Sequence, residues 1–215
     1  RFFVGIGLAR QSQYDRARAW FGANLRVERG TRDPEARFFI QQGLSFYRYF
    51  SGRYRAAAVA NRRSFDAALK SDFPYGKVLA ADMRGHLLVQ LGEVPAGLEQ
   101  LSQAEKWAKS LGNQGVSEAI QISILAYRAQ YGLDPKNSIK RLKTALDELS
   151  PQDTYSQSSL LLELSRQQLM RGDTEMAETA LERASQLVYS TQNRRHEVTL
   201  NLRHAHLYHL SGAPS

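Results

Sequence analysis

The sequence contains no cysteine. This absence excludes disulfide bonds, thiolate catalysis and zinc sites built on cysteine, and it leaves the redox compartment open. No run of apolar residues is long enough to cross a bilayer, and the first residues do not have the pattern of a signal peptide. We therefore expect a protein that does not insert into membranes, and we expect it in the cytoplasm.

Motifs for catalysis are also missing. The Gly-Ile-Gly triplet at residues 5–7 follows no strand, so it is not a dinucleotide-binding loop. No phosphate-cradling loop, nucleophile elbow or pair of in-register carboxylates occurs elsewhere. His206 and His209 are one helical turn apart, but His204 and His206 would point in nearly opposite directions on a helix. The sequence therefore predicts no enzyme, no cofactor and no metal site.

No stretch alternates apolar and polar residues over the length of a strand, so we expect an all-α protein. What the sequence does contain is three series of residues repeated in phase. One series consists of a serine and then glycines spaced by 40 residues: Ser12, Gly52, Gly92, Gly132, Gly172 and Gly212. A second, mostly of small residues, lies seven positions earlier: Gly5, Ser45, Gly85, Leu125, Ser165 and Ala205. A third follows in the next helices: Ala17, Ala57, Gly97, Ser138 and Ala177.

The third series contains one inserted residue, later removed, around Asp134. Three series in phase indicate a helical hairpin repeated along the chain, with small residues where the two helices of a hairpin approach each other. The second helix of one hairpin is predicted over residues 54–70. The residues of this helix expected to face the core are Ala57, Ala60, Phe65, Ala68 and Leu69.

Helix start signals divide the chain into hairpins. Asp33-Pro34 combines an N-cap oxygen with a proline suited to the first helical turn, and Asp72-Phe73-Pro74 and Asp134-Pro135 give similar signals. The predicted hairpins span about residues 1–30, 33–71, 74–111, 114–150 and 153–190, and an unpaired helix follows at 194–211. We expect one array over residues 1–215. Because both ends lie inside the repeat pattern, we also expect a fragment of a longer protein.

Residues in both helices of the hairpins resemble tetratricopeptide repeats, which carry a Leu-Gly pair in the first helix and Ala, an aromatic and Ala in the second. The residues that follow this pattern are Val4, Gly5 and Leu8 with Tyr14, Ala17 and Phe21; Gly85 and Leu88 with Gly97, Leu101 and Ala104; and Ala177, Leu181 and Ala184. The repeat of 40 residues is longer than the usual length of about 34 and is similar to the long repeats of MalT-like bacterial regulators. Departures from the pattern occur at Leu125, Gln41 and Gln121.

The resemblance covers essentially the whole chain and implies a right-handed superhelical solenoid of about 5.5 repeats. It also implies a scaffold for protein–protein interaction within a bacterial signalling or regulatory protein. In such arrays the first helices line a concave groove that receives a peptide, a helix or a partner domain. The corresponding groove residues here are Phe39, Gln42, Phe46, Tyr49, Phe50, Asp82, His86, Gln90, Gln130 and Arg166.

The helix over residues 35–51 can be interpreted in two ways. Its six aromatic residues are spread around much of its circumference. Aromatic side chains give a binding groove large contact area, but an all-round apolar helix is equally typical of one buried on several sides. The sequence leaves open whether these aromatics belong to the core or to the groove.

The formal charge of +8 is uneven along the chain. Residues 1–100 hold 16 Lys and Arg against 9 Asp and Glu, whereas the remainder hold 13 against 12. Within the basic half, Arg53, Arg55, Arg62 and Arg63 form a basic patch. No nucleic-acid-binding motif accompanies it, so a solvated surface is the favoured interpretation.

Two alternatives to the interaction module remain. One is the effector-sensing repeat domain of a transcription regulator, and the other is direct nucleic-acid binding through the basic N-terminal half. The sequence identifies neither the partner nor the oligomeric state.

Overall fold

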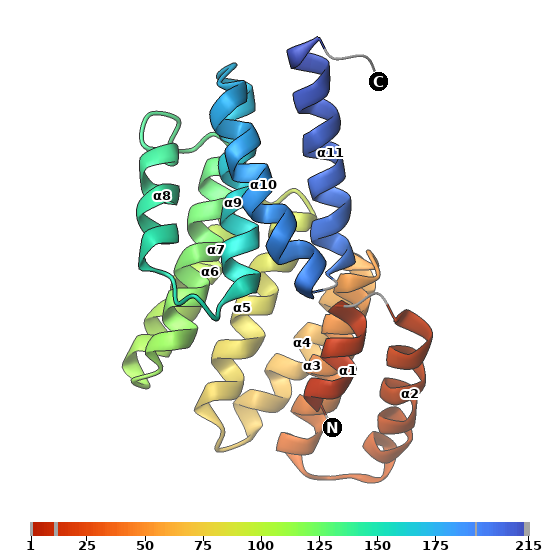
Figure 1. Ribbon diagram of the computed structural model, residues 1–215. Helices are drawn as coiled ribbons and strands as arrows, with labels where there is room; N and C mark the ends of the chain where they lie inside the picture. Colours follow the sequence, from red (N-terminus) through yellow and green to blue (C-terminus); the bar gives the residue numbers. More distant parts are fainter. Residues whose placement is uncertain (1, 11–12, 192, 213–215) are drawn as a thin grey trace. The chain divides into compact units, whose positions relative to one another are not determined.

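The computed structural model describes residues 2–10, 13–191 and 193–212, apart from the side chains of residues 2, 3, 10, 24–27 and 29. In these residues it contains eleven α-helices and no strand, which confirms the all-α prediction (Figure 1). None of the helices described combines enough length with enough apolarity to cross a membrane. The helices are α1 (Phe2–Arg10), α2 (Tyr14–Gly30), α3 (Pro34–Phe50), α4 (Tyr54–Lys70), α5 (Pro74–Gln90), α6 (Val94–Ser110), α7 (Gln114–Gln130), α8 (Ser138–Glu148), α9 (Thr154–Met170), α10 (Thr174–Thr191) and α11 (Arg194–Ser211).

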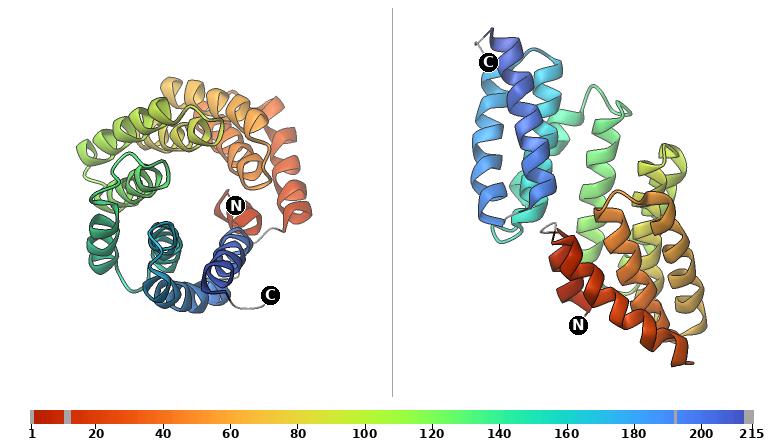
Figure 2. Two further views of the ribbon diagram at one scale, coloured as in Figure 1. Left: turned by 90° about the horizontal axis from the view of Figure 1, so that it is seen from above. Right: turned by 90° about the vertical axis from the view of Figure 1, so that its right-hand side faces the viewer.

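The chain forms two compact units, residues 1–121 and 122–215, and α7 spans the boundary between them. In the first unit α1 packs against α2, α3 against α4, and α5 against α6. The first helices α1, α3 and α5 also contact one another in chain order, and α2 and α4 each pack against the next first helix. In the second unit α8 packs on α9, and α9, α10 and α11 lie side by side (Figure 2).

The glycines spaced by 40 residues end the first helices. Gly52, Gly92, Gly132, Gly172 and Gly212 all have positive φ angles, between 67° and 92°. At the end of α5, the amide of Gly92 donates to the carbonyl oxygen of Val89 (3.1 Å), and the amide of Glu93 donates to that of Leu88 (2.9 Å). This pair of bonds satisfies helix-end carbonyls and turns the chain, and glycine adopts the required left-handed conformation at low cost.

The two series of small residues meet in the hairpins of α3 with α4 and of α5 with α6. A Cβ atom added at Gly85 would lie 2.5 Å from Cγ of Leu101 and 2.9 Å from the carbonyl oxygen of Gly97. In the preceding hairpin, the hydroxyl of Ser45 donates to the carbonyl oxygen of Ala57 at 3.1 Å, at the positions 40 residues earlier. Paired helices therefore touch backbone to backbone at this level, which only small side chains permit.

Helix α8 starts later than the sequence predicts. It begins at Ser138 instead of Asp134-Pro135 and has 11 residues, whereas α4 and α6 have 17 each. The carboxylate of Asp134 accepts hydrogen bonds from Arg141 (3.0 Å) and Asn137 (3.3 Å) within a turn. The residue inserted in the third series is therefore absorbed by this turn, and Ser138 remains buried.

The two other predicted helix starts differ from each other. At α3 the prediction is confirmed, because the carboxylate of Asp33 accepts a hydrogen bond from the amide of Glu35 at 2.9 Å. At α5 the predicted cap is wrong: Phe73 holds the N-cap position, and no side chain caps the helix. Asp72 lies one residue too early to act as the cap.

Replacing Gly85 by alanine tests the backbone contact. We predict that Gly85→Ala lowers the free energy of unfolding by about 1–3 kcal/mol, because the new Cβ overlaps Leu101 and the backbone of Gly97. The matched control is Gly22→Ala within α2, where nothing lies within 4 Å of the added atom. This control should be neutral or stabilising by up to about 1 kcal/mol, because alanine has the higher helix propensity. Urea unfolding followed by circular dichroism measures both, and equal losses in the two variants would contradict the close contact.

Candidate functional site

The aromatic residues of α3 divide between the core and the surface. The helix packs against α1, α2, α4 and α5, so it is enclosed on several sides. Phe38, Tyr47 and Tyr49 are buried, whereas the side chains of Phe46 and Phe50 are half-buried. Some of these aromatics therefore belong to the core and others remain accessible, and the half-buried Phe46 and Phe50 pack against the buried cluster that contains Tyr49.

Gln42 lies in the core, which removes it from the predicted groove. Its side chain is 0% exposed. Its amide nitrogen donates to the carbonyl oxygen of Leu79 on α5 at 2.9 Å, and its amide oxygen accepts from the hydroxyl of Ser64 on α4 at 2.8 Å. Because both halves of the amide have partners, this polar side chain can occupy a buried packing position.

Five of the predicted groove residues form one connected network, which we call the aromatic patch: Phe46, Tyr49, Phe50, Asp82 and His86. The ring of Phe50 stacks with Phe46 at a centroid distance of 6.3 Å and meets Tyr49 edge-on at 5.5 Å. Tyr49 lies 6.2 Å from the His86 ring, and Nε2 of His86 is 3.4 Å from Oδ1 of Asp82. The side chains of Asp82 and His86 are each 22% exposed. The patch thus combines aromatic area on α3 with a neighbouring imidazole and carboxylate on α5, the first helices of two consecutive hairpins.

Two other predicted groove residues of the first unit have different surroundings. Phe39 belongs to a second aromatic cluster, with centroid distances of 5.1 Å to Phe38 and 5.5 Å to Phe73. Gln90 follows His86 by about one helical turn on α5 and is half-buried.

The remaining two predicted groove residues, Gln130 and Arg166, belong to the second unit. Gln130 is exposed at the end of α7. The guanidinium of Arg166 donates to the carboxylate of Glu163 at 2.8–3.1 Å and to the carbonyl oxygen of Ala129 at 2.9 Å. With its side chain 16% exposed, Arg166 mainly connects α9 to α7.

Arg203 on α11 lies beside this pair and was not singled out by the sequence analysis. It is half-buried, and its Nε has no hydrogen-bond partner among the residues that the structure describes. Burial lowers the pKa of Arg203, the neighbouring Arg166 lowers it further, and the carboxylate of Glu163 opposes both effects. Arg203 therefore lies within the electrostatic influence of both Arg166 and Glu163, which already pair with each other. The sequence feature that could have pointed to Arg203 is its spacing, because it follows Glu163 by one repeat length of 40 residues.

The basic patch is exposed but does not face one direction. Arg53 holds the N-cap position of α4 without a side-chain cap, and the other three arginines lie on that helix. Arg55 and Arg62 are about two turns apart and share a side of the helix, whereas Arg63 is turned by about 100° from Arg62. Arg63, but not Arg62, lines a pocket of the first unit.

Comparison with known proteins supports the fold and gives no family. No protein-family model and no curated protein matches the sequence. Among solved structures, the crystal structure of BtubC (BKLC) from P. vanneervenii is similar, with a TM-score of 0.60. The similarity covers 85% of this chain and 76% of that chain at 14% sequence identity. At this identity it shows a shared helical fold alone.

The environment of Arg203 leads to a stability prediction. Arg203→Met keeps an unbranched side chain but removes the partnerless donor and the repulsion from Arg166, so the free energy of unfolding should rise by about 1 kcal/mol. Arg194→Met, at an exposed position of the same helix, is the control and should change stability by less than about 0.5 kcal/mol. Thermal unfolding of both variants provides the measurement. A lower melting temperature for Arg203→Met alone would show that the arginine stabilises the free protein.

Proposed function

We propose that this chain is a protein-interaction module built as a tetratricopeptide-like array. In this proposal residues 1–215 form one right-handed solenoid of about 5.5 repeats, similar to the long repeats of MalT-like regulators. The support is that positions 40 residues apart have the same structural roles, as turn glycines and as small residues at the helix contact. The similarity to BtubC is consistent with such an all-helical arrangement.

The aromatic patch is the observation that carries the functional proposal. Aromatic side chains provide large contact area with few rotatable bonds, so they lose little conformational entropy on binding. The neighbouring Asp82 and His86 add a carboxylate acceptor and an imidazole ring that can orient a ligand. Because both helices are held by hairpin packing, the patch is preorganised, which lowers the cost of binding.

The partner that fits this surface is a peptide or helix with an apolar anchor for Phe46 and Phe50 and a hydrogen-bond donor or cation for Asp82. Recognition then depends on complementarity of shape and charge, and the module itself performs no chemistry. Such a module would act in the cytoplasm as the scaffold of a bacterial signalling or regulatory protein, where the repeat array recruits or senses another polypeptide.

A peptide selection with the purified chain tests the proposal. We predict that peptides enriched from a displayed random library bind the double variant Asp82→Lys/His86→Ala at least about 10-fold more weakly, a loss of about 1.4 kcal/mol. Both substitutions are at partly exposed positions, so the fold should be retained. The control is Glu99→Lys, which makes the same charge change at an exposed position of α6 and should alter affinity less than about 2-fold.

Isothermal titration calorimetry with the enriched peptides gives the affinities, and circular dichroism verifies the fold of each variant. Failure to enrich any ligand, or equal affinities for the patch variant and the control, would exclude the aromatic patch as the binding surface.

A further inference from the structure

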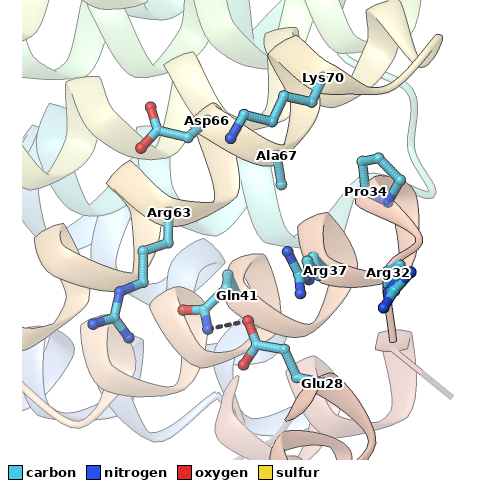
Figure 3. Close-up of a pocket in the computed structure, with 9 residues that line it drawn as sticks. All are labelled: Glu28, Arg32, Pro34, Arg37, Gln41, Arg63, Asp66, Ala67 and Lys70. Atoms are coloured by element: carbon cyan, nitrogen blue, oxygen red, sulfur yellow. Dashed lines mark hydrogen bonds between the residues drawn. The ribbon is translucent and has the colours of Figure 1, made fainter. Parts of the chain in front are cut away.

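A pocket of about 420 Å³ in the first unit has an unusual charge composition (Figure 3). It is formed by side chains from α2, α3, α4 and the link between α2 and α3. Arg32, Arg37, Arg63 and Lys70 are cationic, whereas Glu28 and Asp66 are anionic, so the pocket carries an excess of two positive charges. It shares no residue with the aromatic patch.

Three of these cations have no hydrogen-bond or ion-pair partner in the part of the chain that the structure describes. Arg32, Arg63 and Lys70 make no side-chain hydrogen bond or ion pair with any residue that the structure describes, although two carboxylates line the same pocket. Cations gathered around one pocket repel each other, and a bound anion would relieve this repulsion. Their donors are therefore available to a ligand.

Hydrogen bonds hold two of the other charged groups, Arg37 and Glu28, in place. Nε of Arg37 donates to the carbonyl oxygen of Thr31 at 3.1 Å, which orients the guanidinium and leaves its terminal nitrogens available. The buried amide of Gln41 donates to the carboxylate of Glu28 at 2.6 Å (Figure 3). Because Glu28 is directed to Gln41, it does not pair with the arginines of the pocket.

We propose that this pocket binds a phosphate monoester. A phosphate monoester carries about −1.5 to −2 charges at pH 7, which matches the excess of two positive charges better than a single carboxylate does. Guanidinium groups bind phosphate oxygens through paired N–H donors, and arginines contributed by different segments can approach the phosphate from several sides. The volume exceeds that of the phosphate alone and leaves room for the group that bears it. That group is a small molecule or the phosphorylated side chain of a partner.

The test compares two adjacent arginines of α4. Arg63→Glu reverses a charge that lines the pocket, and Arg62→Glu makes the same change at an exposed position outside it. Isothermal titration calorimetry of the full chain uses free O-phosphoserine, a phosphoserine peptide with alanine flanks, the unphosphorylated peptide and a single-stranded oligonucleotide. We expect either both phosphorylated probes or the phosphopeptide alone to bind. Arg63→Glu should lower the affinity for the bound probe at least about 10-fold, and Arg62→Glu should lower it less than about 3-fold.

The probes also distinguish the source of the phosphate. Equal binding of O-phosphoserine and the phosphopeptide supports a small-molecule ligand, whereas binding of the peptide alone supports a phosphorylated partner. Arg63→Lys should retain part of the affinity, because it restores the charge without the forked donors. Absence of binding to every phosphorylated probe overturns the proposal. It is also overturned if only a single-stranded oligonucleotide binds and the two charge reversals weaken that binding equally, since this identifies a general polyanion surface.

Discussion

The direct approach of the two backbones within the hairpins of α3 with α4 and of α5 with α6 is the constraint on which the rest of the structure depends. With Gly85 facing Gly97, α6 lies close enough for Leu101 to cover the first helix. Other hairpins repeat this arrangement, because a Cβ added at Gly5 would lie 2.5 Å from the ring of Phe21, and Leu181 is fully buried at the corresponding position after Ser165. A small residue and a large one 16 positions later thus act together. They set the distance between the helices, and that distance determines which side chains remain accessible.

Features set by a short segment or by the repeat spacing could be predicted from the sequence, whereas the room that neighbouring helices leave for a particular side chain could not. A glycine with positive φ acts through its own backbone, and the side chain of Asp33 caps an amide only two residues away, so the turn glycines and the cap of α3 were recognisable. The same sequence pattern also predicted Leu69 in the core together with Ala68, yet Leu69 is 54% exposed and Ala68 is fully buried against Phe38 and Ala80. The tight space between α3, α4 and α5 accepts a methyl group there, and hydrophobicity alone does not reveal how much room a neighbour leaves.

The candidate sites show the same division. Periodicity places Phe46 and His86 at equivalent positions of consecutive first helices, so repeat spacing was sufficient to bring the aromatic patch together. The role of Arg166 depends on a carbonyl group 37 residues away, and the environment of Arg203 depends on how α11 packs. The pocket proposed to bind a phosphate monoester combines residues from three helices and the link between α2 and α3, and no sequence motif marks such an assembly.

The buried amide of Gln42 has a mechanical consequence. It bridges α3 to both α4 and α5, and Asn61 likewise joins α4 to the carbonyl oxygen of Ala80 on α5 at 2.9 Å. Sliding one hairpin along the next would leave these amides without partners away from water, a penalty of about 1–3 kcal/mol for each group. Apolar contacts alone are not directional and would permit such sliding. Under a pulling force, residues 34–90 should therefore unfold cooperatively in one step, and not one hairpin after another.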